Sequence, residues 1–131
     1  MATDEEVRIM YTVARFTTDS SNLAVVEDIG NRINKIRPDS FVGIRKAGDG
    51  FAFGLCADEG WFQHREAVLR FVELAGPIVK SSIELHVSAT IDVAIEPEDR
   101  ANGATLIVVR LDPDLMRELS ECGIAIEISR Y

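Results

Sequence analysis

The clearest pattern in the chain is an alternation of apolar and mostly polar residues over residues 83–95, with an apolar side chain at every odd position. Because successive side chains of a β-strand point to opposite faces, the pattern predicts a strand with one face on a core and the other in water. Such a strand is typical of an antiparallel sheet that is covered on one side. Its length predicts a bulge or a bend within it.

A shorter alternation over residues 7–14 predicts a first strand. We expect its apolar face to lie on the core, and this face consists of Val7, Ile9, Tyr11 and Val13. Its opposite face, which includes Arg8 and Thr12, is then expected beside the polar face of the long strand.

Two segments repeat apolar residues at three- and four-residue steps, which is the spacing of an amphipathic helix. The first covers residues 23–36 and ends before Pro38, because the residue before a proline disfavours the helical conformation. The second covers residues 61–75, and Gly76-Pro77 is expected to end or kink it.

Between these helices, residues 41–47 and 51–56 read as the two strands of a hairpin around Gly48-Asp49-Gly50. These glycines join two strands, whereas a phosphate-binding loop leads from a strand into a helix. We therefore interpret them as a turn.

After the long strand, residues 104–111 are apolar on both faces and predict a strand in the interior of the sheet. Asp112 and Pro113 then form a strong helix start, with Asp as the N-cap and Pro at the first helical position. The helix is expected to run from Pro113 to Cys122 and to stop at Gly123, before a last strand from Ile124.

The predicted order is β-α-β-β-α-β-β-α-β, an α+β domain with a largely antiparallel sheet and its helices on one face. The first six elements have the ferredoxin-like order. The length of 131 residues fits a single domain over residues 1–131, with residues 1–6 expected to be flexible. The direction of the last strand is left open.

The net charge of −8 narrows the choice of partners. An acidic chain repels phosphate backbones, and neither a basic patch nor an RNA-binding motif is found, so we expect no nucleic acid. A basic protein partner is compatible with this charge, although a solvated acidic surface is the simpler interpretation. The start of the chain lacks a secretory signal and no apolar run is long enough for a membrane span, which predicts a cytoplasmic protein without membrane contact.

Residues that could carry chemistry are few. Cys56 and His64 are near in sequence and could form a nucleophile and its base, but Asp58 and Glu59 between them would raise the pKa of the thiol. No metal-ligand spacing and no cofactor motif is found, so we expect neither a metal nor a cofactor. Whether the protein is an enzyme stays open, and the sequence favours a non-enzymatic role.

The polar face of the long strand is the best candidate for a working surface. If this face receives a ligand or partner, its residues are Glu84, His86, Ser88, Thr90 and Asp92, with Glu127 and Tyr131 from the last strand. An ordinary solvent-facing sheet remains the simpler interpretation.

The C-terminal half combines an apolar strand at Leu106-Ile107-Val108, a helix start at Leu111-Asp112-Pro113, and a last strand that begins at Gly123 and ends in Tyr131. In this combination it resembles the end of a family of small bacterial proteins of unknown function. Some small acidic domains of this kind look like immunity proteins, which neutralise a toxin by tight binding.

The leading hypothesis is therefore a non-enzymatic bacterial protein-binding domain, as an immunity or accessory protein of unknown partner. The alternative is a small-molecule-sensing regulatory domain, because the ferredoxin-like order also serves ligand-binding modules. Homodimerisation is compatible with both.

Overall fold

The computed structural model describes residues 9–18, 23–46, 50–95 and 109–130. Within these ranges it confirms an α+β chain with a five-stranded, mostly antiparallel sheet and three α-helices. The elements in chain order are β1 (Ile9–Thr18), α1 (Leu23–Ile36), β2 (Val42–Lys46), β3 (Gly50–Glu59), α2 (Trp61–Ser82), the 3₁₀ helix η1 (Ile83–Leu85), β4 (Val87–Ile95), α3 (Pro113–Glu121) and β5 (Ile124–Arg130).

The sheet has the strand order β2-β3-β1-β4-β5, so β1 lies at its centre. β1 runs antiparallel to both β3 and β4, and β2 runs antiparallel to β3. β5 runs parallel to β4, which answers the question that the sequence left open. The parallel pairing is possible because the long connection between these strands contains α3 and returns the chain to the same end of the sheet.

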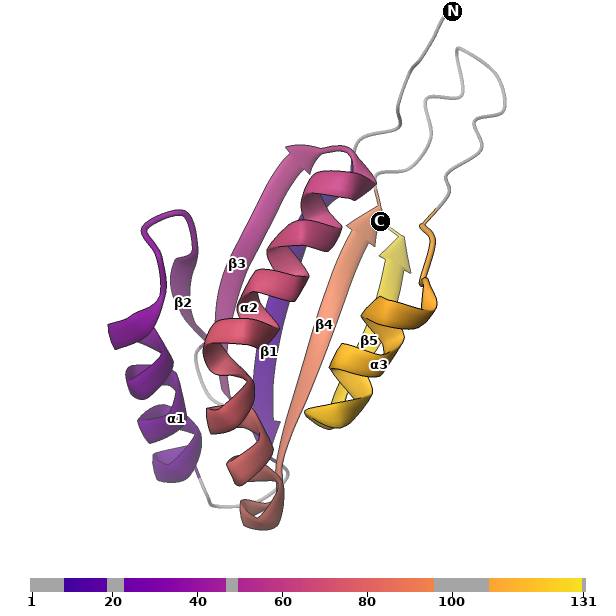
Figure 1. Cartoon of the computed structure of the whole chain (residues 1–131). Helices are drawn as coiled ribbons and strands as arrows, with labels where there is room; N and C mark the ends of the chain where they lie inside the picture. The colour runs from indigo at the N-terminus through magenta and orange to yellow at the C-terminus, as the bar shows by residue number, and fades with distance from the viewer. Residues whose placement is uncertain (1–8, 19–22, 47–49, 96–108, 131) are drawn as a thin grey trace, which may run out of the picture.

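All three helices lie on one face of the sheet, as Figure 1 shows. The core fills the space between the two layers. At its centre the ring of Phe16 on β1 lies 6.2 Å from that of Phe53 on β3 and 6.1 Å from that of Phe71 on α2, centroid to centroid. No described element covers the other face, which we call the open face.

The first helix is confirmed over the predicted residues. Its buried side chains, Val26, Ile29 and Ile33, follow helical spacing and face the core. Gly30 is also buried, and a Cβ at this position would lie only 2.5 Å from the ring of Phe51 on β3. The glycine therefore allows α1 to approach the sheet closely.

The prediction that Gly76-Pro77 ends or kinks the second helix near Ala75 is wrong as to its end, because α2 continues to Ser82. Pro77 lies inside the helix and removes one backbone hydrogen bond. Val72, Ala75 and Val79 are nevertheless buried, so packing against the core holds the helix together through the proline.

Beyond Ile9, the prediction for the two faces of the first strand is wrong, because the side chains expected on the core face away from it and the others face the core. The β1–β4 register shifts between Ile9 and Tyr11, and a one-residue shift moves every following side chain to the other face. Thr12 is therefore buried under the helices, while Tyr11 and Val13 point to the open face.

The predicted capping of the last helix is confirmed. Asp112 is the N-cap of α3, its carboxylate accepts a hydrogen bond from the backbone N–H of Leu115 at 3.2 Å, and Pro113 follows it. Gly123 has a φ of 70° just after the helix, as a C′ glycine should. The side chain of Arg65 on α2 also donates two hydrogen bonds to Asp112, at 2.7 and 2.8 Å, and so ties the start of α3 to α2.

Replacing Asp112 with alanine is expected to lower the melting temperature, because α3 loses its cap and Arg65 loses its partner. The Arg65 hydrogen bonds hold the pKa of Asp112 well below its usual range, so this stabilisation is present above about pH 4 and is lost as the pH falls toward the folded-state pKa. Asp114→Ala is the control, because that carboxylate is 71% exposed and pairs with Arg117 on the same helix. Equal effects of the two substitutions in thermal denaturation would contradict the account.

Several sequence predictions lie wholly or partly outside the described residues. These are the flexibility of residues 1–6, Val7 and Arg8 of the first strand, the turn at residues 47–49, most of the strand at residues 104–111 and the end of the last strand at Tyr131. Of that last segment, Val109 to Leu111 are described and are not in a strand. The full nine-element order is therefore not tested.

Candidate functional site

The open face carries the polar row that the sequence singled out, in shortened form. Ser88, Thr90 and Asp92 alternate on β4 with the buried Val87, Ala89 and Ile91, and so point to the open face. In the β4–β5 register Asp92 stands opposite Glu127, which is exposed. The structure therefore brings these four candidate residues together on one face.

The other three predicted residues do not join this row. Glu84 lies in η1, because the chain continues from α2 into a 3₁₀ turn where the sequence predicted the start of a strand. His86 is exposed and has a φ of 61°, so it forms the bend that precedes β4. Tyr131 lies outside the described residues.

Asp92 is buried rather than solvent-facing, with only 1% of its surface exposed. Arg15 on β1 forms an ion pair with its carboxylate, and the hydroxyl of Ser129 on β5 donates a hydrogen bond to it at 2.7 Å. Because β4 lies between β1 and β5, side chains from both neighbours cover the carboxylate. The pair satisfies the buried charge and leaves Asp92 with a structural role.

One end of the open face contains a polar hollow of about 700 Å³. It is lined by three of the predicted residues, His86, Ser88 and Thr90, together with Thr17 and Thr18 of β1. The rest of its lining is Val87, Ala89, Gly123 and Ala125. Hydroxyl groups and an imidazole can both donate and accept hydrogen bonds, so this hollow suits a small polar ligand.

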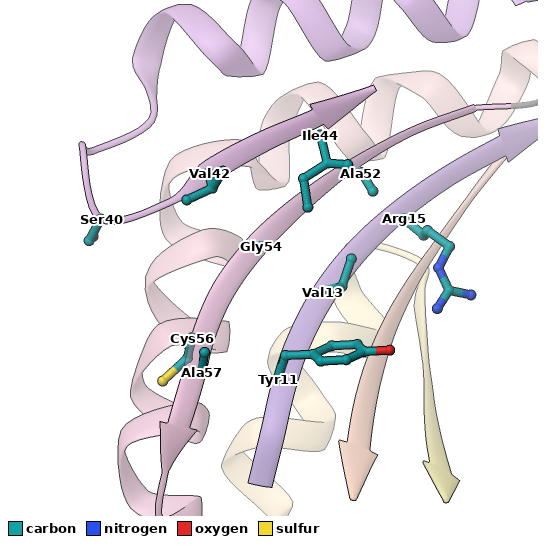
Figure 2. A pocket seen from close by; sticks show the side chains of 10 residues that line it. All are labelled: Tyr11, Val13, Arg15, Ser40, Val42, Ile44, Ala52, Gly54, Cys56 and Ala57. Carbon is teal, nitrogen blue, oxygen red and sulfur yellow. The ribbon is translucent and has the colours of Figure 1, made fainter. Parts of the chain in front are cut away.

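A second hollow, which sequence reasoning missed, is an apolar groove of about 600 Å³ on the same face. It runs along β3 between β1 and β2, and its lining is largely apolar and small (Figure 2). Its larger apolar lining residues are Tyr11, Val13, Val42 and Ile44. The side chains of Val42 and Ile44 on β2 are 57% and 44% exposed. The apolar residues of β1 and β2 that flank the groove are visible in the sequence, but the alternation in β1 predicted that Tyr11 and Val13 face the core.

Cys56 and His64 do not form a catalytic pair in the described structure. Cys56 lines the apolar groove, whereas His64 on α2 is fully buried and its Nδ1 lies 2.7 Å from the hydroxyl of Thr12. Burial raises the pKa of the Cys56 thiol, and burial lowers the pKa of His64. Both groups are therefore held in their neutral forms, and a protonated thiol is a poor nucleophile.

Within the ranges that the structure describes, no group of three or more His, Cys, Asp or Glu side chains could hold a metal ion. Over the same residues, the helices are too short or too polar to cross a membrane.

Comparison with models of protein families, with curated proteins and with solved structures finds no match to this chain.

Proposed function

We propose that this chain is a cytoplasmic, non-enzymatic protein-binding domain whose working surface is the open face of its sheet. The observation that carries the proposal is the exposure of Val42 and Ile44 beside an apolar groove. Exposed apolar side chains that gather at a groove are typical of interaction sites rather than of ordinary surface. The neutral forms of Cys56 and His64, and their separation, support a role without nucleophilic catalysis.

The order β1, α1, β2, β3, α2, β4 and the position of β1 between β3 and β4 support a ferredoxin-like arrangement for this part of the chain. In this arrangement two helices cover one face and leave the other available for a partner. The net charge of −8 would steer a basic protein toward the domain and speed its association. An immunity or accessory protein is a class of binding domain that works in this way.

The substitution Ile44→Glu is expected to reduce retention of a protein partner about tenfold or more, because it places a charge in the apolar contact. The measurement is a quantitative pull-down at low salt from the organism that carries the gene. Phe62→Glu is the matched control, because Phe62 is 66% exposed but lies on α2, on the covered side of the sheet. The proposal would be contradicted if the two variants retained the partner equally well. It would also be contradicted if no captured protein differed in amount between either variant and the wild type.

A second candidate function, small-molecule sensing, is favoured by the polar hollow around Ser88 and Thr90. Its volume of about 700 Å³ lies within the usual range of ligand pockets. A metabolite that raises the melting temperature of the wild type by mass action, but not that of Thr90→Val, would favour sensing over protein binding.

A further inference from the structure

The apolar groove has the form of a trough whose lowest point is a glycine. Val13 on β1 and Val42 on β2 both stand opposite Gly54 in the sheet, and Ile44 stands opposite Ala52. Larger side chains on both sides therefore flank the smallest residues of β3, as Figure 2 shows.

Nothing in the fold of the described chain requires a glycine at position 54. A Cβ built there would meet its nearest neighbours, side-chain atoms of Ile44 and Val42 and the carbonyl oxygen of Val42, at 3.9 Å, which is an ordinary contact distance. Its φ is not in the left-handed region, unlike that of Gly123. A Cβ at Gly50, by contrast, would lie 2.1 Å from the carbonyl oxygen of Phe16.

A glycine inside a strand weakens the strand, and it often marks a place where a ligand or another chain approaches closely. Because neither packing nor backbone conformation explains Gly54, the space above it points to an occupant from outside the described chain. No described element covers the open face above the trough, so the occupant is better explained as a side chain on a protein surface than as an enclosed small molecule.

The charges around the trough indicate the chemistry of that occupant. Asp39 precedes Ser40 at one end of the trough, and Asp58 and Glu59 follow Ala57 at the same end. All three carboxylates are exposed, and none forms an ion pair with another described residue. The cation that lines the trough, Arg15, is already engaged by Asp92. The trough is therefore apolar along its floor, and the chain next to one of its ends carries three exposed carboxylates.

We infer that the trough over Gly54 receives an apolar side chain of a protein partner, and that lysine or arginine residues beside this side chain contact Asp39, Asp58 and Glu59. This inference rests on the proposed function and names the partner chemistry for the same face. A second copy of this chain fits less well, because each copy carries a net charge of −8 and the same three carboxylates.

The first test uses a short synthetic peptide with one tryptophan between lysines, and a matched peptide with glutamates in place of the lysines. In NMR titrations the lysine peptide is expected to shift the amide signals of Val42, Ile44 and Gly54 in the wild-type protein. The glutamate peptide is expected to bind at least about tenfold more weakly than the lysine peptide. Absence of shifts, shifts confined to other residues, or equal binding of the two peptides would overturn the inference.

The variant Gly54→Val fills the trough and is expected to abolish these shifts while the protein stays as stable as the wild type or becomes more stable. A β-branched residue is favoured in a strand, so loss of binding would not reflect loss of the fold, and thermal denaturation checks this point. Gly54→Ala fills less of the trough and is expected to give peptide-induced shifts between those of the wild type and those of Gly54→Val. Wild-type binding by a folded Gly54→Val would contradict the inference.

The contact with the three carboxylates is tested by the combined change Asp39→Asn, Asp58→Asn and Glu59→Gln, which keeps the side-chain shapes. Asparagine also tolerates the positive φ of 57° at position 58. We expect about tenfold weaker binding of the lysine peptide. Unchanged binding would show that the inferred contact of lysine or arginine residues with these carboxylates is wrong.

The failure of this inference can be told apart from the failure of the proposed function. If Ile44→Glu removes the protein partner in the pull-down and a folded Gly54→Val does not, the open face binds the partner but the trough does not hold its anchor. If neither change has an effect, both proposals are wrong. A mass of two chains in light scattering that falls to one with Gly54→Val would assign the trough to a second copy and overturn the inference.

Discussion

Replacing Arg15 with methionine is expected to destabilise the protein by about 3–5 kcal/mol, because it leaves a buried carboxylate without its cation. Asp92 is 1% exposed and lies in the middle of the sheet, where Arg15 and Ser129 are its partners. Breaking a buried ion pair from one side costs more than removing both charges, since the remaining charge keeps its desolvation cost. The free energy of unfolding from urea denaturation measures the effect.

The double variant Arg15→Met with Asp92→Leu is expected to recover most of that loss, because no buried charge then remains. Arg32→Met on α1 is the control for loss of a cation, since Arg32 is exposed and its removal should change stability by less than about 0.5 kcal/mol. A loss for Arg15→Met no larger than that of the control would show that the pair does not hold Asp92 in the sheet.

Acidification below about pH 6.5 is expected to destabilise the protein through His64. The side chain is fully buried, its Nδ1 is hydrogen-bonded to Thr12, and its Nε2 has no partner among the described residues. Burial lowers its pKa, while the backbone and the nearby carboxylates of Glu59 and Asp58 partly oppose this effect. The unfolded state therefore binds more protons between the unfolded and the folded pKa, so stability rises with pH across that window.

The variant His64→Gln cannot titrate and is expected to flatten the dependence of unfolding free energy on pH below about pH 6.5, between the unfolded-state pKa and the lowered folded-state pKa of the histidine. His86→Gln is the control, because His86 is exposed. Trp61 lies in the same first turn of α2, and its indole N–H donates to the backbone carbonyl of Arg110 at 3.1 Å, so its fluorescence reports on this part of the structure. A slope in His64→Gln equal to that of the wild type would contradict a role for His64.

Features of the fold that depend on local sequence could be predicted. The spacing of Val26, Ile29 and Ile33 predicted α1, and the Asp112-Pro113 pair predicted the start of α3. The features that were missed depend on contacts between distant segments. Packing against the core carries α2 through Pro77, and a register shift after Ile9 exchanges the faces of β1, which alternation alone does not show.

In the candidate site, too, features set by local sequence could be predicted and features set by contacts between distant segments could not. The sequence indicated that Ser88 and Thr90 lie on a free face of the sheet, and the structure places them there. The burial of Asp92 could not be predicted, because it requires Arg15 and Ser129 from the two neighbouring strands. The apolar groove was missed for a related reason: it appears only when β2 and β1 are placed on either side of the small residues of β3.

The most direct test of the account is photo-crosslinking in the native organism from two positions of the chain. A photoreactive residue at Val42 lies beside the groove on the open face, and one at Phe62 lies on α2 on the covered side. We expect a crosslink to a specific protein from position 42, absent when Ile44→Glu is added, and none to that protein from position 62. Crosslinks to that protein from position 62 alone, or crosslinks from position 42 that persist with Ile44→Glu, would contradict the open face as the binding surface.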